Sequence, residues 1–169
     1  VRKVFESDAG HDATLWKQIA EMGWHGTAIP ENYGGLGLGY LELCVVAEEL
    51  GRALAPVPFS STVYLFAEAL LAAGSEEQKK KYLPKVASGE LIGTFARAEG
   101  PGAVTPKSIR LSFKGGKLSG KKIAVADGLD ADYAVVLART GDEAGERGLG
   151  LALVDLKGPG VTRRVEDSI

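Results

Sequence analysis

The sequence predicts an α+β protein in which an amino-terminal all-helical domain precedes a small antiparallel β-barrel or sandwich domain. Three observations favour this class: apolar residues at helical spacing as far as Gly89, alternating or continuous apolar runs after Glu90, and glycine-rich turns between those runs. Helices followed by strands indicate segregated α and β regions. We therefore expect a helical domain over residues 1–89 and a β-domain, truncated at its end, over residues 90–169.

Four helices are expected in the first domain. Asp12 is placed to cap the first helix, whose apolar residues follow helical spacing as far as Met22 before Gly23 ends it. The second helix is expected from Tyr40 to Leu50 and the third from Ser61 to Ala73.

The fourth helix is predicted from a capping pattern. In Ser75-Glu76-Glu77-Gln78 the serine hydroxyl can accept a hydrogen bond from the third helical amide, while the glutamine side chain bonds back. Pro84 is expected to disturb this helix, and Ser88-Gly89 should close it.

Five strands and one clear hairpin are expected in the second domain. The predicted strands cover residues 91–98, 108–113, 118–125, 133–138 and 149–156. Lys114-Gly115-Gly116-Lys117 is the hairpin turn, because two adjacent glycines readily adopt the positive φ values that tight hairpins require. The run from Tyr133 to Ala138 is nearly all apolar, so we expect both of its faces to be buried.

Composition excludes several classes of function. Lys and Arg number 20 against 22 Asp and Glu, and this balance gives no indication of nucleic-acid or anionic-membrane binding. No apolar run reaches the ~20 residues that a membrane span requires. Cys44 is the only cysteine, which rules out an internal disulfide and favours a reducing cytoplasm. No Cys/His cluster indicates a metal site. The chain starts at Val1 in mid-pattern, so we interpret it as part of a longer protein.

Several motifs, in a fixed order, carry a family resemblance. The turn Ile29 to Leu38 leads into a helix ending Glu48-Glu49-Leu50-Gly51-Arg52, and Gly74 to Lys79 and Leu118 to Lys122 follow. Together they resemble the acyl-CoA dehydrogenase family. The resemblance implies three parts, namely helices, a small β-barrel and a carboxy-terminal four-helix bundle.

The same resemblance implies FAD as cofactor and an acyl-CoA as substrate. In such enzymes a glutamate removes the α-proton while the β-hydrogen leaves as hydride to the flavin, and electrons pass on to an electron-transfer flavoprotein. The base and the hydride acceptor must act on opposite sides of one carbon–carbon bond. The glutamate usually belongs to the bundle, which we expect beyond Ile169, so no catalytic residue is assigned within this chain.

Alignment with the family's flavin-contacting runs, Thr-Glu-Pro and Trp-x-Thr, gives the candidate cofactor-binding residues. They are Phe95, Arg97, Ala98, Glu99, Ala124, Val125 and Ala126. Alanines stand where the family has threonine, tryptophan and threonine, and each lost hydroxyl removes a donor worth ~1 kcal/mol. Backbone amides remain as donors, which leaves weak, altered or lost FAD binding open.

Other side chains have competing interpretations. Arg97 can replace the missing hydroxyls toward the flavin, or it can be a surface arginine or a partner of Glu99. Trp16 and Trp24 are predicted to be packing residues. His25 lies in a predicted loop and is expected at the surface or in a turn.

The sequence and the family resemblance lead to two hypotheses of function from different classes, and to a third that has less support. The first is an FAD-dependent acyl-CoA dehydrogenase, homo- or hetero-oligomeric. The second is a non-catalytic partner subunit of a hetero-oligomeric dehydrogenase, suggested by the alanines at 98, 124 and 126. The third is a stand-alone binding or structural domain. The acyl group of the substrate stays open.

Overall fold

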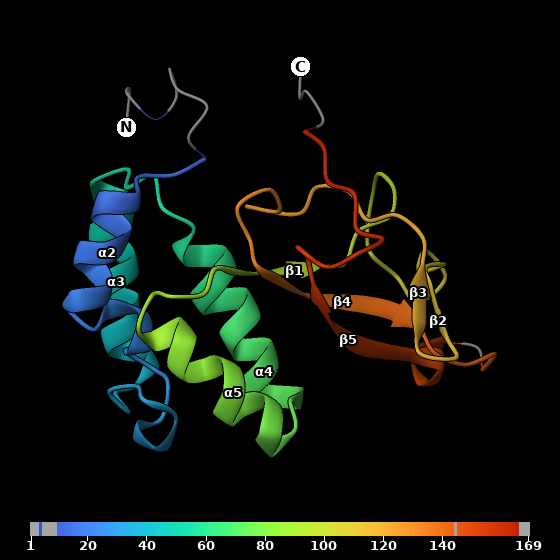
Figure 1. Cartoon of the computed structure of the whole chain (residues 1–169), viewed down its shortest axis with the longest axis horizontal. Helices are drawn as coiled ribbons and strands as arrows, with labels where there is room; N and C mark the ends of the chain where they lie inside the picture. Colours follow the sequence, from blue (N-terminus) through green and yellow to red (C-terminus); the bar gives the residue numbers. More distant parts are fainter. Residues whose placement is uncertain (1–3, 5–9, 144, 166–169) are drawn as a thin grey trace. The chain divides into compact units, whose positions relative to one another are not determined.

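The chain forms one helical unit and one unit built on a β-sheet (Figure 1). The structure is a computed structural model that describes residue 4, residues 10–143 and residues 145–165. The helical unit is Val1–Gly93 and the β-unit is Thr94–Ile169, so the division falls a few residues after the predicted one. The α+β class predicted from the sequence is confirmed.

The helical unit contains the expected helices with adjusted bounds. These are α2 (Ala13–Glu21), α3 (Tyr40–Arg52), a π-helix (Ser60–Ala67) that continues into α4 (Glu68–Ala73), and α5 (Glu76–Ala87). The third predicted helix is therefore continuous, but its first part has the wider π geometry. Within the described residues, no helix is long and apolar enough to cross a membrane.

The helix ends follow the chemistry of their capping residues. Asp12 Oδ1 accepts from the amides of Thr14 at 3.1 Å and Leu15 at 3.0 Å. Before α5, Ser75 Oγ accepts from the Gln78 amide at 3.2 Å and the Ser75 amide donates to Gln78 Oε1 at 2.9 Å, which confirms the capping box. Pro84 lies inside α5, yet the helix continues to Ala87.

The turn from Ile29 to Leu38 folds back on the segment that precedes it. The amides of Leu36, Gly37 and Leu38 donate to carbonyls of residues 26, 29 and 27 at 2.8–2.9 Å. A Cβ at Gly35 would lie 2.0 Å from the Ile29 carbonyl oxygen, so only glycine allows this approach. The motif therefore has a structural role in the helical unit.

The core of the helical unit surrounds a buried histidine. One cluster of its buried apolar residues consists of Trp16, Ile19, Leu43, Phe59 and Val63. His25 is 0% exposed, and its ring lies 3.9 Å from the Trp16 ring and 5.6 Å from the Phe59 ring, centroid to centroid. The expectation of a surface position for His25 was wrong, because the short 3₁₀ turn Trp24–Gly26 directs this side chain inward.

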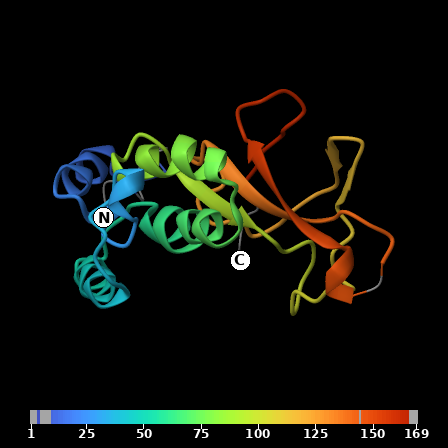
Figure 2. The same cartoon turned by 90° about the horizontal axis from the view of Figure 1, so that it is seen from below.

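The sheet of the β-unit is mixed. Its strands are β1 (Gly93–Ala96), β2 (Ser112–Lys114), β3 (Lys117–Ser119), β4 (Tyr133–Arg139) and β5 (Leu149–Asp155). β4 pairs antiparallel with β5 along its whole length, which Figures 1 and 2 show, and β2 and β3 form the predicted hairpin. β2 meets β4 in parallel through Ser112 and Arg139. The sheet is thus not purely antiparallel, and closure into a barrel stays a prediction.

Three strands are shorter by three residues or more than their apolar patterns predicted: β1, β2 and β3. The first was expected over residues 91–98, but β1 covers only Gly93–Ala96. Residues 108–111 precede β2 without strand pairing, and the Leu111 amide instead donates to the Glu99 carboxylate. β3 ends at Ser119 because Gly120 and then Ala124, with φ values of 149° and 49°, interrupt the extended backbone.

Candidate functional site

The two predicted cofactor-binding segments lie side by side in the β-unit. The amide of Ile123 donates to the Ala98 carbonyl at 2.9 Å, and Thr94 Oγ1 donates to the Ala126 carbonyl at 2.6 Å. Residues 94–99 and 123–126 are thus joined by one backbone bond and one side-chain bond, and we call these two segments together the candidate edge. The nearest residues of the two segments, 99 and 123, are 24 positions apart in the sequence, and folding brings the segments together.

The backbone of the second segment is strained. Ala124 and Asp127 have φ values of 49° and 51°, a region that side chains with a Cβ rarely adopt. Val125 and Ala126 lie between these two residues, and their amides donate to no acceptor within the described residues. Strain of this kind persists only where the surroundings impose it, and it concentrates at ligand sites. These two amides are therefore available as donors to a ligand.

The side chains of the first segment differ in exposure. Phe95 in β1 is half-buried, whereas the side chain of Arg97 is exposed and forms no ion pair among the residues that the structure describes. The alternative that Arg97 pairs with Glu99 was wrong, because Lys122 is the partner of Glu99. Ala98 and Ala126 bring only methyl groups to the candidate edge, as the sequence indicated.

Glu99 is the charged centre of this region. Its carboxylate accepts from Lys122 Nζ at 2.7 Å, from the Arg110 amide at 2.8 Å and from the Leu111 amide at 3.1 Å. Burial alone would raise the pKa of Glu99, but the hydrogen bonds from Lys122 and the two amides outweigh burial and lower the pKa. Glu99 is thus a stable anion and a weak base, which suits a structural role.

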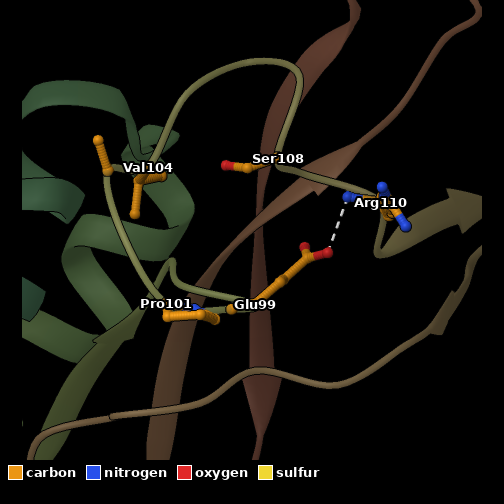
Figure 3. A pocket seen from close by; sticks show the side chains of 7 residues that line it. Glu99, Pro101, Val104, Ser108 and Arg110 are labelled. Carbon is orange, nitrogen blue, oxygen red and sulfur yellow. Dashed lines mark hydrogen bonds between the residues drawn. The ribbon is translucent and has the colours of Figure 1, made fainter.

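A small pocket adjoins Glu99 (Figure 3). It has a volume of about 280 Å³ and is lined by Glu99, Gly100, Pro101, Ala103, Val104, Ser108 and Arg110. Figure 3 shows the Glu99 side chain directed toward the backbone of Arg110 across the base of the loop 100–108. The pocket's volume lies just below the ~300 Å³ at which ligand pockets typically begin.

Sequence reasoning missed Lys122 and the pocket. The pocket lies at the loop that follows Glu99, and Lys122 lies 23 positions from Glu99, so no short pattern pointed to either. Across the described residues, no three His, Cys, Asp or Glu side chains gather as metal ligands would.

The fold and the site define a class of protein: an α+β chain in which a helical unit precedes a β-unit that carries the candidate edge. The family model "Acyl-CoA dehydrogenase, N-terminal domain" matches residues 1–90. The chain therefore belongs to the acyl-CoA dehydrogenase family, as the sequence motifs predicted.

Relatives extend the match into the β-unit. Mitochondrial isovaleryl-CoA dehydrogenase of Arabidopsis thaliana is 39% identical over 85% of this chain and 37% of its own length. The ChsE4-ChsE5 complex of Mycobacterium tuberculosis matches with a TM-score of 0.81 and 31% identity, over 95% of this chain and 43% of that one. Butyryl-CoA dehydrogenase of Megasphaera elsdenii gives a TM-score of 0.78 and 28% identity, over 89% and 42%. The chain thus spans less than half the length of these relatives.

Proposed function

We propose that the whole protein is an FAD-dependent acyl-CoA dehydrogenase and that this chain supplies its helical domain and flavin-binding β-domain. The reaction is the α,β-dehydrogenation of an acyl-CoA thioester. The observation that carries the proposal is the candidate edge, where two separate segments meet and the Val125 and Ala126 amides lack acceptors within the described residues.

The residues present fit a flavin through their main chain. FAD, when bound, supplies the hydride acceptor for this reaction. Amides of residues 97–99 and 125–126 would be the donors that hold the polar rim of its ring system and stabilise negative charge there. Phe95 adds apolar surface, and Ala98 and Ala126 add no hydroxyl donors. This main-chain set predicts weaker FAD binding than hydroxyl donors would give.

Arg97 supplies a charge that the alanines cannot. Its side chain is exposed and forms no ion pair in the described part of the chain, so its guanidinium can approach an anionic flavin or a phosphate. Arg97→Ala should weaken FAD binding, while Arg97→Lys should retain part of it. Unchanged FAD affinity in Arg97→Ala would remove this role.

The substrate and partners follow from the family at the level of chemical class. The named relatives act on isovaleryl-CoA and butyryl-CoA, which points to a short-chain acyl-CoA thioester. An electron-transfer flavoprotein is the expected electron acceptor, and the protein is expected to form a homo- or hetero-oligomer. The unpaired, exposed Cys44 is compatible with a reducing compartment such as the cytoplasm.

The whole protein, purified with added FAD, tests this function directly. We expect a visible flavin absorption band that isovaleryl-CoA or butyryl-CoA bleaches under anaerobic conditions. A protein that binds FAD but is bleached by no acyl-CoA would refute the dehydrogenase activity. A protein that stays colourless would refute the flavoprotein assignment for this chain on its own.

The three alanines favour a second candidate function, that of a partner subunit without a complete flavin site of its own. One similar structure is described as a complex of two chains, ChsE4 and ChsE5, which shows that a related fold occurs in a hetero-complex. A protein that is colourless alone but yields a yellow, active complex when co-expressed with a homologue would favour this candidate.

A further inference from the structure

One ion pair in the β-unit, Lys122–Glu99, has both of its side chains largely buried. The side chains of Lys122 and Glu99 are only 7% and 11% exposed, with Nζ and Oε1 2.7 Å apart. In the pairs Lys17–Glu21, Arg52–Glu49, Lys79–Glu76, Lys114–Asp142 and Lys157–Asp132, by contrast, at least one side chain is 65% exposed or more. Burying two charges is costly, so such a pair persists only when further hydrogen bonds satisfy both groups.

Lys122 forms those bonds with the candidate edge. Its Nζ donates to the Arg97 carbonyl at 3.0 Å as well as to Glu99 Oε1, and the next residue, Ile123, donates its amide to the Ala98 carbonyl. Residues 122 and 123 thus bond to residues 97–99, and we call this set of contacts the clamp. The clamp lies directly before the strained backbone at Ala124.

Glu99 extends the clamp to the core of the β-unit. Its carboxylate also accepts the amides of Arg110 and Leu111, and the Leu111 side chain is buried with Ala96 and Val136. The position of Lys122 Nζ is therefore fixed by groups that belong to packed structure. A charged hydrogen bond is both short and directional, which favours a single geometry.

We propose that Lys122, acting through Glu99, is a positioning residue that sets the spacing between the two halves of the candidate edge and thereby orients the amides that bind the flavin. This inference rests on the proposed flavin binding. Correct placement of the main-chain amides matters more here, because Ala98 and Ala126 provide no side-chain hydroxyls to compensate for a misplaced main chain. Small displacements of binding groups are costly when orientation carries the interaction.

The test compares variants of the whole protein by FAD titration, thermal unfolding and flavin reduction potential. Lys122→Met removes the charge at similar length and should weaken FAD binding about tenfold or more, equivalent to one well-placed hydrogen bond. Lys122→Arg keeps the charge and should retain most of the affinity. Lys117→Met, at an exposed lysine in β3, is the matched control and should leave the affinity unchanged.

A double variant separates positioning from stability. Glu99→Gln combined with Lys122→Met leaves no unpaired buried charge, so its thermal stability should recover relative to Lys122→Met alone. Its FAD affinity should stay as low as in Lys122→Met, and its flavin reduction potential should differ from that of the wild type. Recovery of both stability and affinity would overturn the proposal, because the pair would then serve only folding.

The outcomes also distinguish this inference from the proposed function. A wild-type protein that binds FAD, together with a Lys122→Met variant that binds it equally well, overturns the positioning role alone. A wild-type protein that binds no FAD under any condition overturns the flavin assignment and this inference together.

Discussion

The two units accommodate a buried ionisable side chain in opposite ways. In the helical unit, His25 is fully buried between aromatic rings, and both ring nitrogens lack a hydrogen-bond partner in the described structure. In the β-unit, the Glu99 side chain is 11% exposed and accepts hydrogen bonds from Lys122 and two backbone amides. The His25 ring is thus surrounded by packing without polar contacts, whereas the Glu99 carboxylate is held by an ion pair and hydrogen bonds. The stability of the helical unit should therefore change when a side chain is enlarged or when the pH is lowered. The candidate edge should be affected most when a charged side chain is removed.

The largest effect is expected where the helical unit depends on close backbone approach. In Gly35→Ala the new methyl would lie 2.0 Å from the Ile29 carbonyl oxygen, which is backbone and cannot move away easily. We expect a loss of about 3 kcal/mol or more in unfolding free energy, typical of severe overpacking. Denaturant unfolding of the whole protein measures it.

Gly51→Ala is the matched control for that substitution. Gly51 lies within α3, and nothing lies within 4 Å of its added Cβ. Alanine should stabilise the helix by about 0.5–1 kcal/mol because glycine is a poor helix former. Equal effects of the two substitutions would show that the turn does not require glycine at position 35.

The next largest effect is expected in the pH dependence of stability, which His25 should dominate below pH 7. Burial lowers the pKa of His25 from 6.5 to about 4. Between these values the unfolded chain binds the proton and the folded chain does not, so stability falls as pH decreases through this window. The predicted loss is about 3 kcal/mol between pH 7 and pH 4. His25→Phe should abolish this part of the pH dependence in denaturant unfolding.

Glu99 contributes in a different window. Its pKa is lowered from 4.5 because the hydrogen bonds of Lys122 and the amides outweigh burial. Its stabilisation is therefore complete above pH 4.5 and is lost only as pH falls further. A pH dependence that persists between pH 6.5 and 5 in His25→Phe would contradict the assignment of that window to His25.

A smaller effect is expected at the start of α5. Ser75→Ala removes the hydroxyl that accepts from the Gln78 amide and should cost about 1 kcal/mol. Ser75→Asp keeps an acceptor and should retain the stability. If Ser75→Ala and Ser75→Asp unfold alike, the capping box does not stabilise this helix.

The smallest effect is expected at an exposed ion pair. Lys17 and Glu21 in α2 lie 3.8 Å apart with side chains 80% and 66% exposed. Lys17→Ala should change stability by about 0.5 kcal/mol or less, because solvent screens such pairs. Thermal unfolding of Lys17→Ala beside Lys122→Met contrasts an exposed charge with a buried one, and equal shifts would contradict the role of burial.

Local chemistry accounts for the parts of the fold that the sequence predicted well. Asp12 and Ser75 cap helices through residues two or three positions away, and Gly115-Gly116 forms a hairpin turn with φ values of 57° and 75°. Each feature depends on neighbours in the chain, so a short pattern is enough to predict it.

The features that escaped prediction depend on distant residues. The burial of His25 is set by Trp16 and by Phe59, and the Glu99–Lys122 pair joins residues 23 positions apart. The parallel contact between Ser112 and Arg139 likewise links separate strands. No local pattern encodes such contacts. The candidate residues at 95–99 and 124–126 were found through family resemblance, and the clamp that joins them through the structure.

The central claim is that main-chain amides of the candidate edge hold the flavin. Amide hydrogen exchange of the whole protein with and without FAD tests it most directly. We predict slower exchange at residues 97–99 and at Val125 and Ala126 when FAD is bound, with little change in the turn 29–38. Bound FAD that leaves the exchange of 97–99, Val125 and Ala126 unchanged would contradict the claim.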